Sequence, residues 1–558
     1  NKLDAQDGEL VEAKVDTAVR KHGTQNVDLV RRFGNSSKAK LASLIAIHEH
    51  GIPNDFSTDI LKEAELRSKI PISNPSDLTH LPFISIDPSD ARDHDDAICA
   101  IKDKNNPGGF IIWVAIADVA KYVIPKSELD LESLNRGNST YFPDLVVPMI
   151  PDILSGNVCS LKQGTIRAAL AVKIVINKQG RKLSHSFFRG VIKNRQAVSY
   201  EIAQKTLDND KKIKKLDDLK VLMQPLYQAY KLLENQSHKR HPLELELIEQ
   251  EILLDQEGEV MSINSKQRLV THKLVEEFMI LANVCAAETI QKSKLAFLYR
   301  VHESPTPEKI LNLRTIAKSL NIDLNTSKNI RGEDLNSLLK KSKEENCGDL
   351  VSMIILRSMS QAHYNPQNEG HFGLSLPCYT HFTSPIRRYS DILIHRVLIQ
   401  IHKWEENPII MKSPELSKIG EHLSRTERRS MLAERDAKDR YLATFLKNRL
   451  GEEFFAHING ISRAGIFVRL DQTGADGLIP ISSLGDDTYS LDTGKSRLVG
   501  RVSRTVFNIG ANVLVKLREA NPISGGLIFN LIEYENRPLK ILGNSKKRPK
   551  RKTRYKKK

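Results

Sequence analysis

One short acidic segment constrains this chain more than any other feature. Residues 87–96 read DPSDARDHDD, so five of the ten positions are aspartates and none is glycine. Carboxylates held close together repel one another and do not all stay ionised unless a cation lies among them. The flanking runs, FISI at 83–86 and AICAI at 97–101, are typical of buried strands. The pattern therefore predicts a tight loop that binds a hard cation, Mg²⁺ or Mn²⁺, through oxygen ligands.

Two other interpretations of this segment explain fewer of its features than a metal-binding loop does. An EF-hand loop needs glycine at its sixth position and glutamate at its twelfth, and neither is found when the count begins at Asp87, Asp90 or Asp93. A solvated acidic turn that binds nothing stays open as an alternative, although it would leave the flanking apolar runs unexplained. For Asp90 alone, we expect a solvated loop acid without a role in the site.

The charge of the chain indicates a polyanionic partner. Its 558 residues carry a net charge of +16 and give a pI of about 9.4. Ten Lys or Arg lie among the thirteen residues 546–558, which contain no acid. A segment so basic and so poor in apolar side chains is expected to be disordered until it meets phosphate. A role in solubility alone is an equal alternative for this tail.

Cysteine and hydropathy patterns exclude several classes of protein. The five cysteines are scattered without a C-x-x-C pair, so the sequence predicts neither a zinc ribbon nor a disulfide framework and favours a reducing compartment. The most apolar stretch, 110–123, is too short to span a bilayer and contains Asp118 and Lys121. We therefore expect a monomeric, cytoplasmic protein with no membrane segment.

Further motifs follow the acidic segment along the chain. They are RGNSTYFP at 136–143, the run from 147 to 161, HFGL at 371–374, YTHFTSPIRR at 379–388 and AERD at 433–436. Together with IDPSDARDHDDA at 86–97, they resemble the superfamily of ribonuclease II and ribonuclease R, which are processive 3′-to-5′ exoribonucleases. The motifs at 136–143 and around His381 are more similar to the ribonuclease R branch. The resemblance covers most of residues 83–540.

The resemblance, with the change of pattern along the chain, predicts a multidomain fold. An α+β catalytic domain is expected to be flanked by all-β OB-fold barrels and followed by a disordered basic tail. The expected boundaries are 1–56 for a partial second cold-shock (OB) domain, 57–80 for a linker, 81–448 for the catalytic domain, 451–535 for an S-one type RNA-binding domain and 536–558 for the tail. A complete OB barrel needs roughly 70 residues, and Asn1 is not an initiator methionine. We therefore expect an N-terminally incomplete chain.

Local patterns predict individual elements. In the catalytic domain, strands are expected at 110–119 and 168–176, and amphipathic helices at 274–290 and 350–363. A long helix is expected to begin at Ser413, with Pro414 in its first turn, and to stop at Gly451. Five short alternating runs predict the second OB barrel, at 455–458, 465–470, 477–480, 513–517 and 527–529.

The resemblance implies roles for individual residues of the catalytic centre. Three aspartates are implied to bind the metal, namely Asp87, Asp93 and Asp96. Asp95 is implied to be catalytic, either by orienting the 3′-terminal nucleotide or through a second metal recruited with substrate. Arg387 matches the family's catalytic arginine, and a planar guanidinium can grip two phosphoryl oxygens at once. Glu434 matches an acidic residue near the family's active centre, with pairing to Arg387 as the alternative.

Four further side chains are expected to bind RNA, namely Tyr141, Tyr299, Arg388 and Phe467. Aromatic rings stack on any base, and each stacked base contributes about 1–3 kcal/mol. Tyr141 and Tyr299 occupy family positions for such a clamp, although each could instead be a core tyrosine. Arg388 could contact phosphate or form a structural ion pair.

The barrel has fewer stacking residues than is usual for its type. Ala464 stands where many such domains have phenylalanine, and Pro480 where many have histidine, while Phe467 is retained. A core position is the alternative for both Phe455 and Phe467. With one stacking aromatic ring missing, we expect phosphate contacts to contribute a larger share of the RNA-binding energy.

The resemblance therefore implies an Mg²⁺-dependent, processive 3′-to-5′ exoribonuclease that releases 5′-nucleoside monophosphates, with Mn²⁺ as a second possible metal. Single-stranded RNA 3′ ends are the expected substrate, and structured RNA, the ribosome and the degradation machinery are further partners that the family admits. A metal-dependent phosphodiesterase for small nucleotides is one alternative, but it would not need the barrel or the basic tail. A non-catalytic RNA-binding protein is the other, and the intact acids and Arg387 argue against it.

Overall fold

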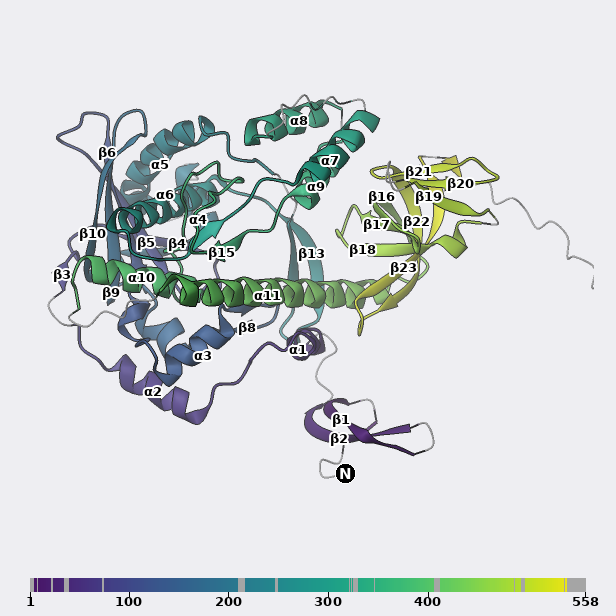
Figure 1. Ribbon diagram of the computed structural model, residues 1–558, viewed down its shortest axis with the longest axis horizontal. Helices are drawn as coiled ribbons and strands as arrows, with labels where there is room; N and C mark the ends of the chain where they lie inside the picture. Colours follow the sequence, from purple (N-terminus) through teal and green to yellow (C-terminus); the bar gives the residue numbers. More distant parts are fainter. Residues whose placement is uncertain are drawn as a thin grey trace, which may run out of the picture.

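The computed structural model describes most of the chain (Figure 1). The described ranges are 5–7, 9–21, 24–34, 40–72, 75–208, 216–245, 249–320, 322, 324, 330–345, 347–405, 412–485, 487–492, 497–535 and 537–538. Figure 1 shows a large body of helices around a sheet, a smaller β-barrel beside it and one long helix that reaches from one to the other. Within these ranges, no helix has the length and hydropathy needed to cross a membrane.

The large domain, which the sequence predicts to be the catalytic domain, is built on a seven-stranded sheet of order β11-β4-β5-β6-β9-β10-β3. Its strands are β3 (Ser76–Asp77), β4 (Ile84–Asp87), β5 (Asp96–Lys102), β6 (Phe110–Ala117), β9 (Ile166–Ile176), β10 (Lys182–Lys193) and β11 (Gln196–Ser199). Neighbouring strands are antiparallel except at the two edges, where β11 runs parallel to β4 and β3 runs parallel to β10. The strands predicted at 110–119 and 168–176 are confirmed as β6 and β9.

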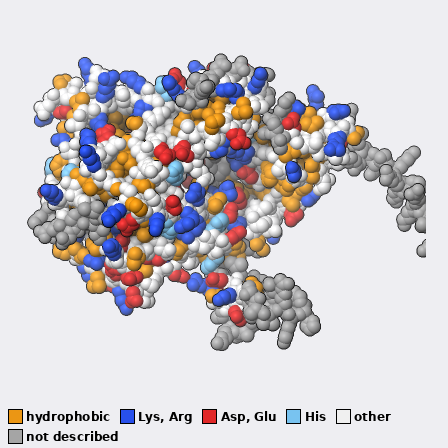
Figure 2. Space-filling view, in the orientation of Figure 1, with side chains coloured by type: hydrophobic (Ala, Val, Ile, Leu, Met, Phe, Trp, Pro, Cys, Tyr) orange, Lys and Arg blue, Asp and Glu red, His pale blue; other side chains and the backbone are white. Residues whose placement is uncertain are grey.

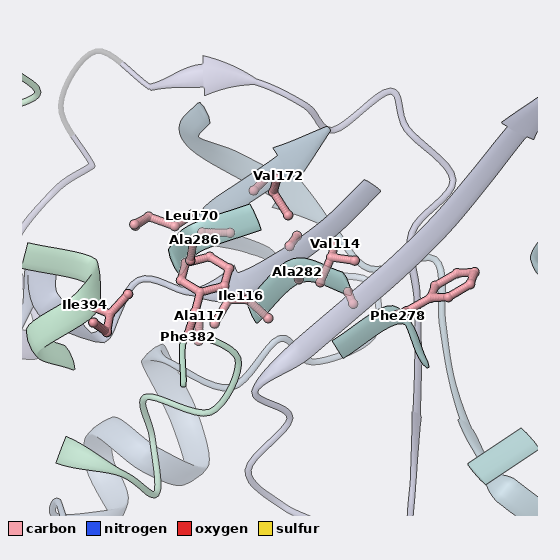
Figure 3. Packing of buried hydrophobic residues seen from close by; sticks show 14 of the residues in the cluster. Val114, Ile116, Ala117, Leu170, Val172, Phe278, Ala282, Ala286, Phe382 and Ile394 are labelled. Carbon is pink, nitrogen blue, oxygen red and sulfur yellow. The ribbon is translucent and has the colours of Figure 1, made fainter. Parts of the chain in front are cut away.

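The middle of the sheet is buried on both faces. β6 reads FIIWVAIA, and seven of its eight residues are buried. Such a continuous apolar run is expected where helices cover both sides of a strand. Figure 3 shows side chains of β6 and β9, among them Val114 and Val172, beside Phe278 and Ala282 of α6 (Val270–Ser293) and Ile394 of α10 (Tyr389–Ile401). This core fixes the strands that carry the acidic loop.

Further helices surround the sheet. They are α3 (Glu128–Arg136), α4 (Tyr200–Leu207), α5 (Leu216–His238), α7 (Pro307–Ser319), α8 (Gly332–Glu344) and α9 (Gly348–Ser358). The helix predicted at 274–290 is confirmed within α6. The helix predicted at 350–363 is only partly right, because Met359 turns to extended backbone (φ −64°, ψ 152°) and ends α9. Residues 363–365 instead form β15 (His363–Asn365), which pairs with β14 (Tyr299–Val301).

The long helix α11 (Ser413–Lys447) begins at the predicted residue and has Pro414 in its first turn. It ends at Asn448, three residues before Gly451, which has a positive φ of 86°. With 35 residues it is roughly 50 Å long. Figure 1 shows α11 running along the catalytic domain to the barrel.

The C-terminal domain is a closed barrel, and all five predicted strands are confirmed. They are β16 (Glu453–Ile461), β17 (Gly465–Leu470), β18 (Asp476–Pro480), β22 (Asn512–Asn521) and β23 (Gly526–Tyr534). The sheet order is β18-β17-β16-β22-β23-β24, where β24 is Arg537–Pro538, and a further pairing of β18 with β23 closes it. A second sheet of β19 (Tyr489–Asp492), β20 (Arg497–Gly500) and β21 (Val506–Asn508) lies between β18 and β22 in sequence.

The N-terminal segment contributes a hairpin and two helices. β1 (Leu10–Lys21) and β2 (Thr24–Gly34) pair antiparallel, and α1 (Lys40–Glu49) packs through Ala46 and Ile47 on Ala433 and Ala437 of α11. The described part of 1–56 thus holds two strands, and its assignment to a cold-shock domain stays a prediction. The expected linker 57–80 instead contains α2 (Thr58–Ser68) and β3, which joins the main sheet.

The predicted basic tail falls almost wholly outside the described residues. Within 536–558, only β24 (Arg537–Pro538) is described, and it pairs with β23. On the face shown in Figure 2, blue Lys and Arg side chains spread over the catalytic domain and the barrel and alternate with red acidic ones. The described surface on this face therefore has no large patch of a single sign.

Candidate active site

The acidic segment forms the loop between β4 and β5, as predicted. Asp87 is the last residue of β4, and Asp96 is the first residue of β5. Ser160 fastens the loop, because its hydroxyl accepts a hydrogen bond from the His94 N–H (3.1 Å) and donates one to the Arg92 carbonyl (2.9 Å). The backbone that carries the carboxylates is therefore anchored at both ends and near its middle.

Asp95 is buried within this loop and is 5% exposed. Its Oδ1 accepts a hydrogen bond from the Ile386 N–H (2.9 Å), and its Oδ2 lies 3.8 Å from Arg387 Nε. Burial raises the pKa of Asp95 well above its usual range, and the positive charge of Arg387 opposes that shift. These contacts join the loop to a segment 291 residues later in the chain.

Arg387 combines a fixed backbone with an open side chain. Its carbonyl accepts a hydrogen bond from the Ser139 N–H (3.0 Å), and its guanidinium donates to Ser384 Oγ (3.2 Å). The side chain is 45% exposed. A cation so placed, next to a buried carboxylate and open on one side, can receive a phosphate group.

Asp87 and Asp96 lie close enough to influence one another. Burial raises the pKa of Asp96 to about 8, and the negative charge of Asp87 adds to the shift. Asp87 Oδ2 lies 2.7 Å from His94 Nδ1, and this hydrogen bond raises the pKa of His94. A carboxylate whose pKa is raised by a second carboxylate lies where a cation would relieve the repulsion.

Tyr141 links the loop to α11. Its hydroxyl donates to Asp93 Oδ2 (3.0 Å), and its backbone N–H donates to Glu434 Oε1 (2.8 Å). Burial raises the pKa of Glu434, and Arg387 is one of the cations that oppose the shift. The Tyr141 side chain is 36% exposed. The structure thus brings Tyr141 and Glu434 to the acidic loop, and it leaves the tyrosine ring partly open.

The donor set fits a hard divalent cation in its chemistry. It consists of the carboxylates of Asp87, Asp93, Asp95 and Asp96, and Mg²⁺ and Mn²⁺ prefer such oxygen ligands. Asp87, Asp93 and Asp96 would hold the cation, with Asp95 beside them. Among the residues that the structure describes, no three acidic, His or Cys side chains converge into a ready-made ligand cage.

Two residues predicted to bind RNA, Tyr299 and Arg388, make their main contacts within the protein itself. Tyr299 is 8% exposed in the core of the catalytic domain, and its ring lies 4.1 Å from that of Phe297. A base cannot stack on a ring so enclosed, so its burial argues against the predicted clamp. Arg388 donates through Nε and Nη2 to the buried carboxylate of Asp391 (2.9 and 2.7 Å). This ion pair favours the structural alternative, and contact between Arg388 and RNA stays a prediction.

Phe467 lies on β17 of the barrel, apart from the carboxylates. It is 40% exposed, and Phe455 is 67% exposed, so neither ring belongs to the barrel core. Phe467 borders a pocket of about 420 Å³ that Arg357 and Asn459 also line. Arg357 Nη1 donates to the Asn459 carbonyl (2.6 Å), so this pocket lies where α9 meets the barrel. The exposed ring is available for stacking.

Sequence reasoning missed several residues of the site. Ser160 fastens the acidic loop, and although it lies in the motif at 147–161, it was given no role. Asp391 holds Arg388, and nothing in its local sequence distinguishes it. Tyr200, the first residue of α4, lies near the acids: burial raises its pKa, and the charges of Asp96 and Asp87 add to the shift. His94 was visible as the one histidine inside the acidic segment.

Family models match both large domains. The model of the RNB domain matches residues 76–403, and the model of the S1 RNA binding domain matches residues 447–531. Ribonuclease R of Buchnera aphidicola is 36% identical over 523 residues, which is 92% of this chain and 72% of that protein. Ribonuclease R of Escherichia coli is 33% identical over 527 residues, which is 92% of this chain and 65% of that protein. The chain thus spans about two thirds of the length of these relatives.

Solved structures of similar proteins indicate the same family. Mycoplasma genitalium RNase R in complex with ribose methylated single-stranded RNA is 28% identical, with a TM-score of 0.85 over 91% of this chain and 80% of that one. The same protein in complex with double-stranded RNA gives 26% identity and a TM-score of 0.82, over 95% and 90% of the two chains. Yeast Ssd1, described as a pseudonuclease, shares only the fold, with 16% identity and a TM-score of 0.65 over 88% of this chain and 62% of that one.

Because a pseudonuclease shares the fold, the fold alone does not establish catalysis. The active-site residues must be present as well. This chain keeps the acidic loop and Arg387 together in one place. The RNB model covers more than half of the chain, and ribonuclease R relatives match 92% of it. The chain belongs to the ribonuclease R family of RNB-domain 3′-to-5′ exoribonucleases.

Proposed function

We propose that this chain degrades RNA processively from the 3′ end and releases 5′-nucleoside monophosphates, with Mg²⁺ as its metal and Mn²⁺ as a substitute. The single observation that carries the proposal is the contact between Asp95 and the segment of Ile386 and Arg387, which places a buried acid and an open guanidinium side by side. An acid that orients the reacting nucleotide beside a cation that binds the phosphate would favour phosphodiester hydrolysis.

Each group at the site has a part in this reaction. When bound, the divalent cation would neutralise phosphoryl oxygens and make a bound water more acidic. Asp87, Asp93 and Asp96 would hold it, and Asp95 would orient the 3′-terminal nucleotide beside it. Arg387 grips the phosphoryl oxygens as their charge develops. Glu434 fixes the backbone of the Tyr141 segment through the Tyr141 N–H.

The substrate is a single-stranded 3′ end, including one that extends from structured RNA. The half-exposed ring of Tyr141 stacks on a base near the acids, and Phe467 stacks on a base farther along the strand. Support for both kinds of RNA comes from the similar Mycoplasma genitalium protein, whose structures contain single-stranded and double-stranded RNA. We place this activity in the cytoplasm.

The test is a digestion of 5′-labelled RNA in Mg²⁺, with and without a hairpin near the 3′ end, analysed on a denaturing gel. We expect the label to pass to a short limit product with few intermediates, and body-labelled RNA to yield 5′-nucleoside monophosphates. Chelation of the metal with EDTA should stop the reaction, and added Mg²⁺ should restore it. Internal fragments, or degradation from the labelled end, would contradict the proposal.

A further inference from the structure

Three carboxylates of the acidic loop are held in the same way, by one protein donor on one oxygen. Asp93 Oδ2 accepts from the Tyr141 hydroxyl (3.0 Å), and Asp95 Oδ1 accepts from the Ile386 N–H (2.9 Å). Asp87 Oδ2 lies 2.7 Å from Nδ1 of His94. Asp87 and Asp93 thus each have one oxygen held by the protein and a second oxygen that can bind a cation, whereas the second oxygen of Asp95 lies 3.8 Å from Arg387 Nε. Tyr141 and Ile386 belong to motifs already discussed, whereas His94 has no assigned role.

His94 is placed for this contact by its own backbone. Its N–H donates to Ser160 Oγ (3.1 Å), and its carbonyl accepts from the Leu161 N–H (2.9 Å). The imidazole side chain is 15% exposed, and the Asp87 side chain is 16% exposed. The backbone of His94 is therefore held by residues 160–161, while its ring contacts Asp87 at the end of β4. Through this contact His94 connects the later part of the acidic loop to its beginning.

We propose that His94 is a positioning residue for Asp87, whose Oδ2 it holds through the ring Nδ1–H so that Oδ1 is presented to the divalent cation. This inference rests on the proposed function, because it concerns the metal of the same site. Asp87 stands at the end of a strand, and its side chain has only two rotatable bonds, so a single hydrogen bond to one oxygen restricts where the other oxygen points. Hydrogen bonds behind a metal ligand commonly change metal affinity by roughly 10- to 100-fold.

Two other roles of His94 would give different results, so the proposal can be tested. If His94 held Asp87 away from the cation, its removal would strengthen metal binding. If it served only to stabilise the loop, its removal would lower the unfolding temperature and leave metal affinity unchanged in the folded fraction.

The variants are His94→Phe, which keeps a ring but has no donor, and His94→Gln, which can donate again from its amide. The matched control is His50→Phe, because His50 Nε2 lies 2.6 Å from Asp436 Oδ2 in a histidine–carboxylate pair between α1 and α11. The probe is Mn²⁺ alone, with its affinity measured by calorimetry and by electron paramagnetic resonance on the full chain without RNA. Folding of each variant is checked by its thermal unfolding temperature.

We expect His94→Phe to weaken Mn²⁺ binding by roughly 10- to 100-fold, His94→Gln to recover part of the loss, and His50→Phe to bind Mn²⁺ as the wild type does. The Mn²⁺ concentration for half-maximal cleavage should rise by the same factor in His94→Phe, while kcat at saturating Mn²⁺ stays close to the wild-type value. RNA affinity in EDTA should not change.

Unchanged or tighter Mn²⁺ binding by folded His94→Phe would overturn the proposal, and so would an equal loss in His50→Phe. A fall in kcat that saturating Mn²⁺ does not restore would do the same, because it would give His94 a part in the chemical step. These failures differ from failure of the proposed function, in which the wild-type protein itself would neither bind Mn²⁺ nor cleave RNA.

Discussion

Asp95 receives its environment from two distant segments of the chain. Its carboxylate accepts the Ile386 N–H and lies beside Arg387, while its own carbonyl accepts a hydrogen bond from the Ala117 N–H of β6 (2.9 Å). The side chain can therefore be altered without freeing the backbone. This makes Asp95 the best residue at which to separate chemistry from folding.

Replacement of Asp95 by Asn should stop catalysis and spare binding. The Asn carbonyl can still accept the Ile386 N–H, but the negative charge is lost. We expect the single-turnover cleavage rate to fall by at least ~10²-fold, while the Kd for RNA measured in EDTA stays within a few-fold. Asp90→Asn is the control, because Asp90 is exposed and makes no predicted contribution. Cleavage at the wild-type rate by Asp95→Asn would remove Asp95 from the mechanism.

Arg387→Lys tests whether the shape of the cation matters. Lysine keeps the charge but cannot bond two phosphoryl oxygens from one plane. We expect kcat to fall by about 10²-fold or more, with little change in the Kd for RNA. Rapid-quench kinetics and fluorescence anisotropy would measure the two quantities. Equal losses in both would show instead that Arg387 binds the ground state of the RNA.

The site illustrates what a sequence can and cannot reveal about single residues. The density of acids at 87–96 predicted the loop, because only a few arrangements tolerate so much like charge. Arg387 came from a family motif, and the same motif left two roles open for its neighbour Arg388, a phosphate contact or a structural ion pair. Arg388 pairs with Asp391, which lies about one helical turn later in the chain. Nothing in the sequence around Asp391 predicts this ion pair. Burial of Tyr299 depends likewise on contacts that span the fold.

At the scale of elements, β10 and α6 meet at a buried histidine. His185 Nε2 lies 2.8 Å from Thr289 Oγ1, and the side chain is 10% exposed. Burial lowers the pKa of His185 from 6.5 to about 4, and the charge of Lys182 adds to the shift. In the unfolded chain the imidazole binds a proton near its ordinary pKa. The neutral ring therefore stabilises the folded state fully only above pH 6.5.

As the pH falls from 6.5 to 4, the unfolded state gains the proton first, so this stabilisation is lost. We expect the free energy of unfolding of the wild type to fall by up to about 3 kcal/mol more than that of His185→Gln across this window. Glutamine is chosen because its amide can still bond Thr289. Urea titrations at pH 7 and pH 4.5 would measure the difference. Parallel pH profiles for the two proteins would contradict the lowered pKa.

Elements with strong end signals were the most predictable. α11 begins at Ser413 because proline favours a first turn, and it stops just before a glycine with positive φ. The barrel strands followed from their alternation. The helix predicted through 363 failed because residues 363–365 pair with β14, a contact made across more than sixty positions. Periodicity alone does not distinguish the end of such a helix from a buried strand.

At the scale of the whole molecule, the basic tail and the barrel should contribute differently to RNA binding. Each phosphate contact adds about −0.7 to the log–log slope of affinity for a single strand against salt. Deletion of 546–558 removes ten cations. We expect a flatter slope and slower association, with the same polarity and limit product. Filter binding across a salt series would measure the slope, and stopped-flow fluorescence the association rate.

Deletion of 451–535 in addition removes the barrel with Phe455 and Phe467. We expect shorter processive runs on long RNA, measured with an excess of unlabelled competitor, and unchanged cleavage of short oligonucleotides. An unaltered salt slope after deletion of the tail would contradict its proposed role. Complete loss of cleavage on short oligonucleotides at low salt after that deletion would also contradict it, because the tail has no metal-binding or water-activating group.

The continuity of α11 has a mechanical consequence. Glu434 contacts the active-site segment at one point of the helix, and Leu442, Ala443 and Leu446 are buried in the barrel core only two to three turns later, about 12–18 Å along the axis. No glycine or proline interrupts residues 434–447, so this stretch has no hinge. If RNA contacts both the acids and the barrel, as proposed, we expect the rigid α11 to keep the two contacts at a constant separation. That separation would set the shortest RNA able to reach both.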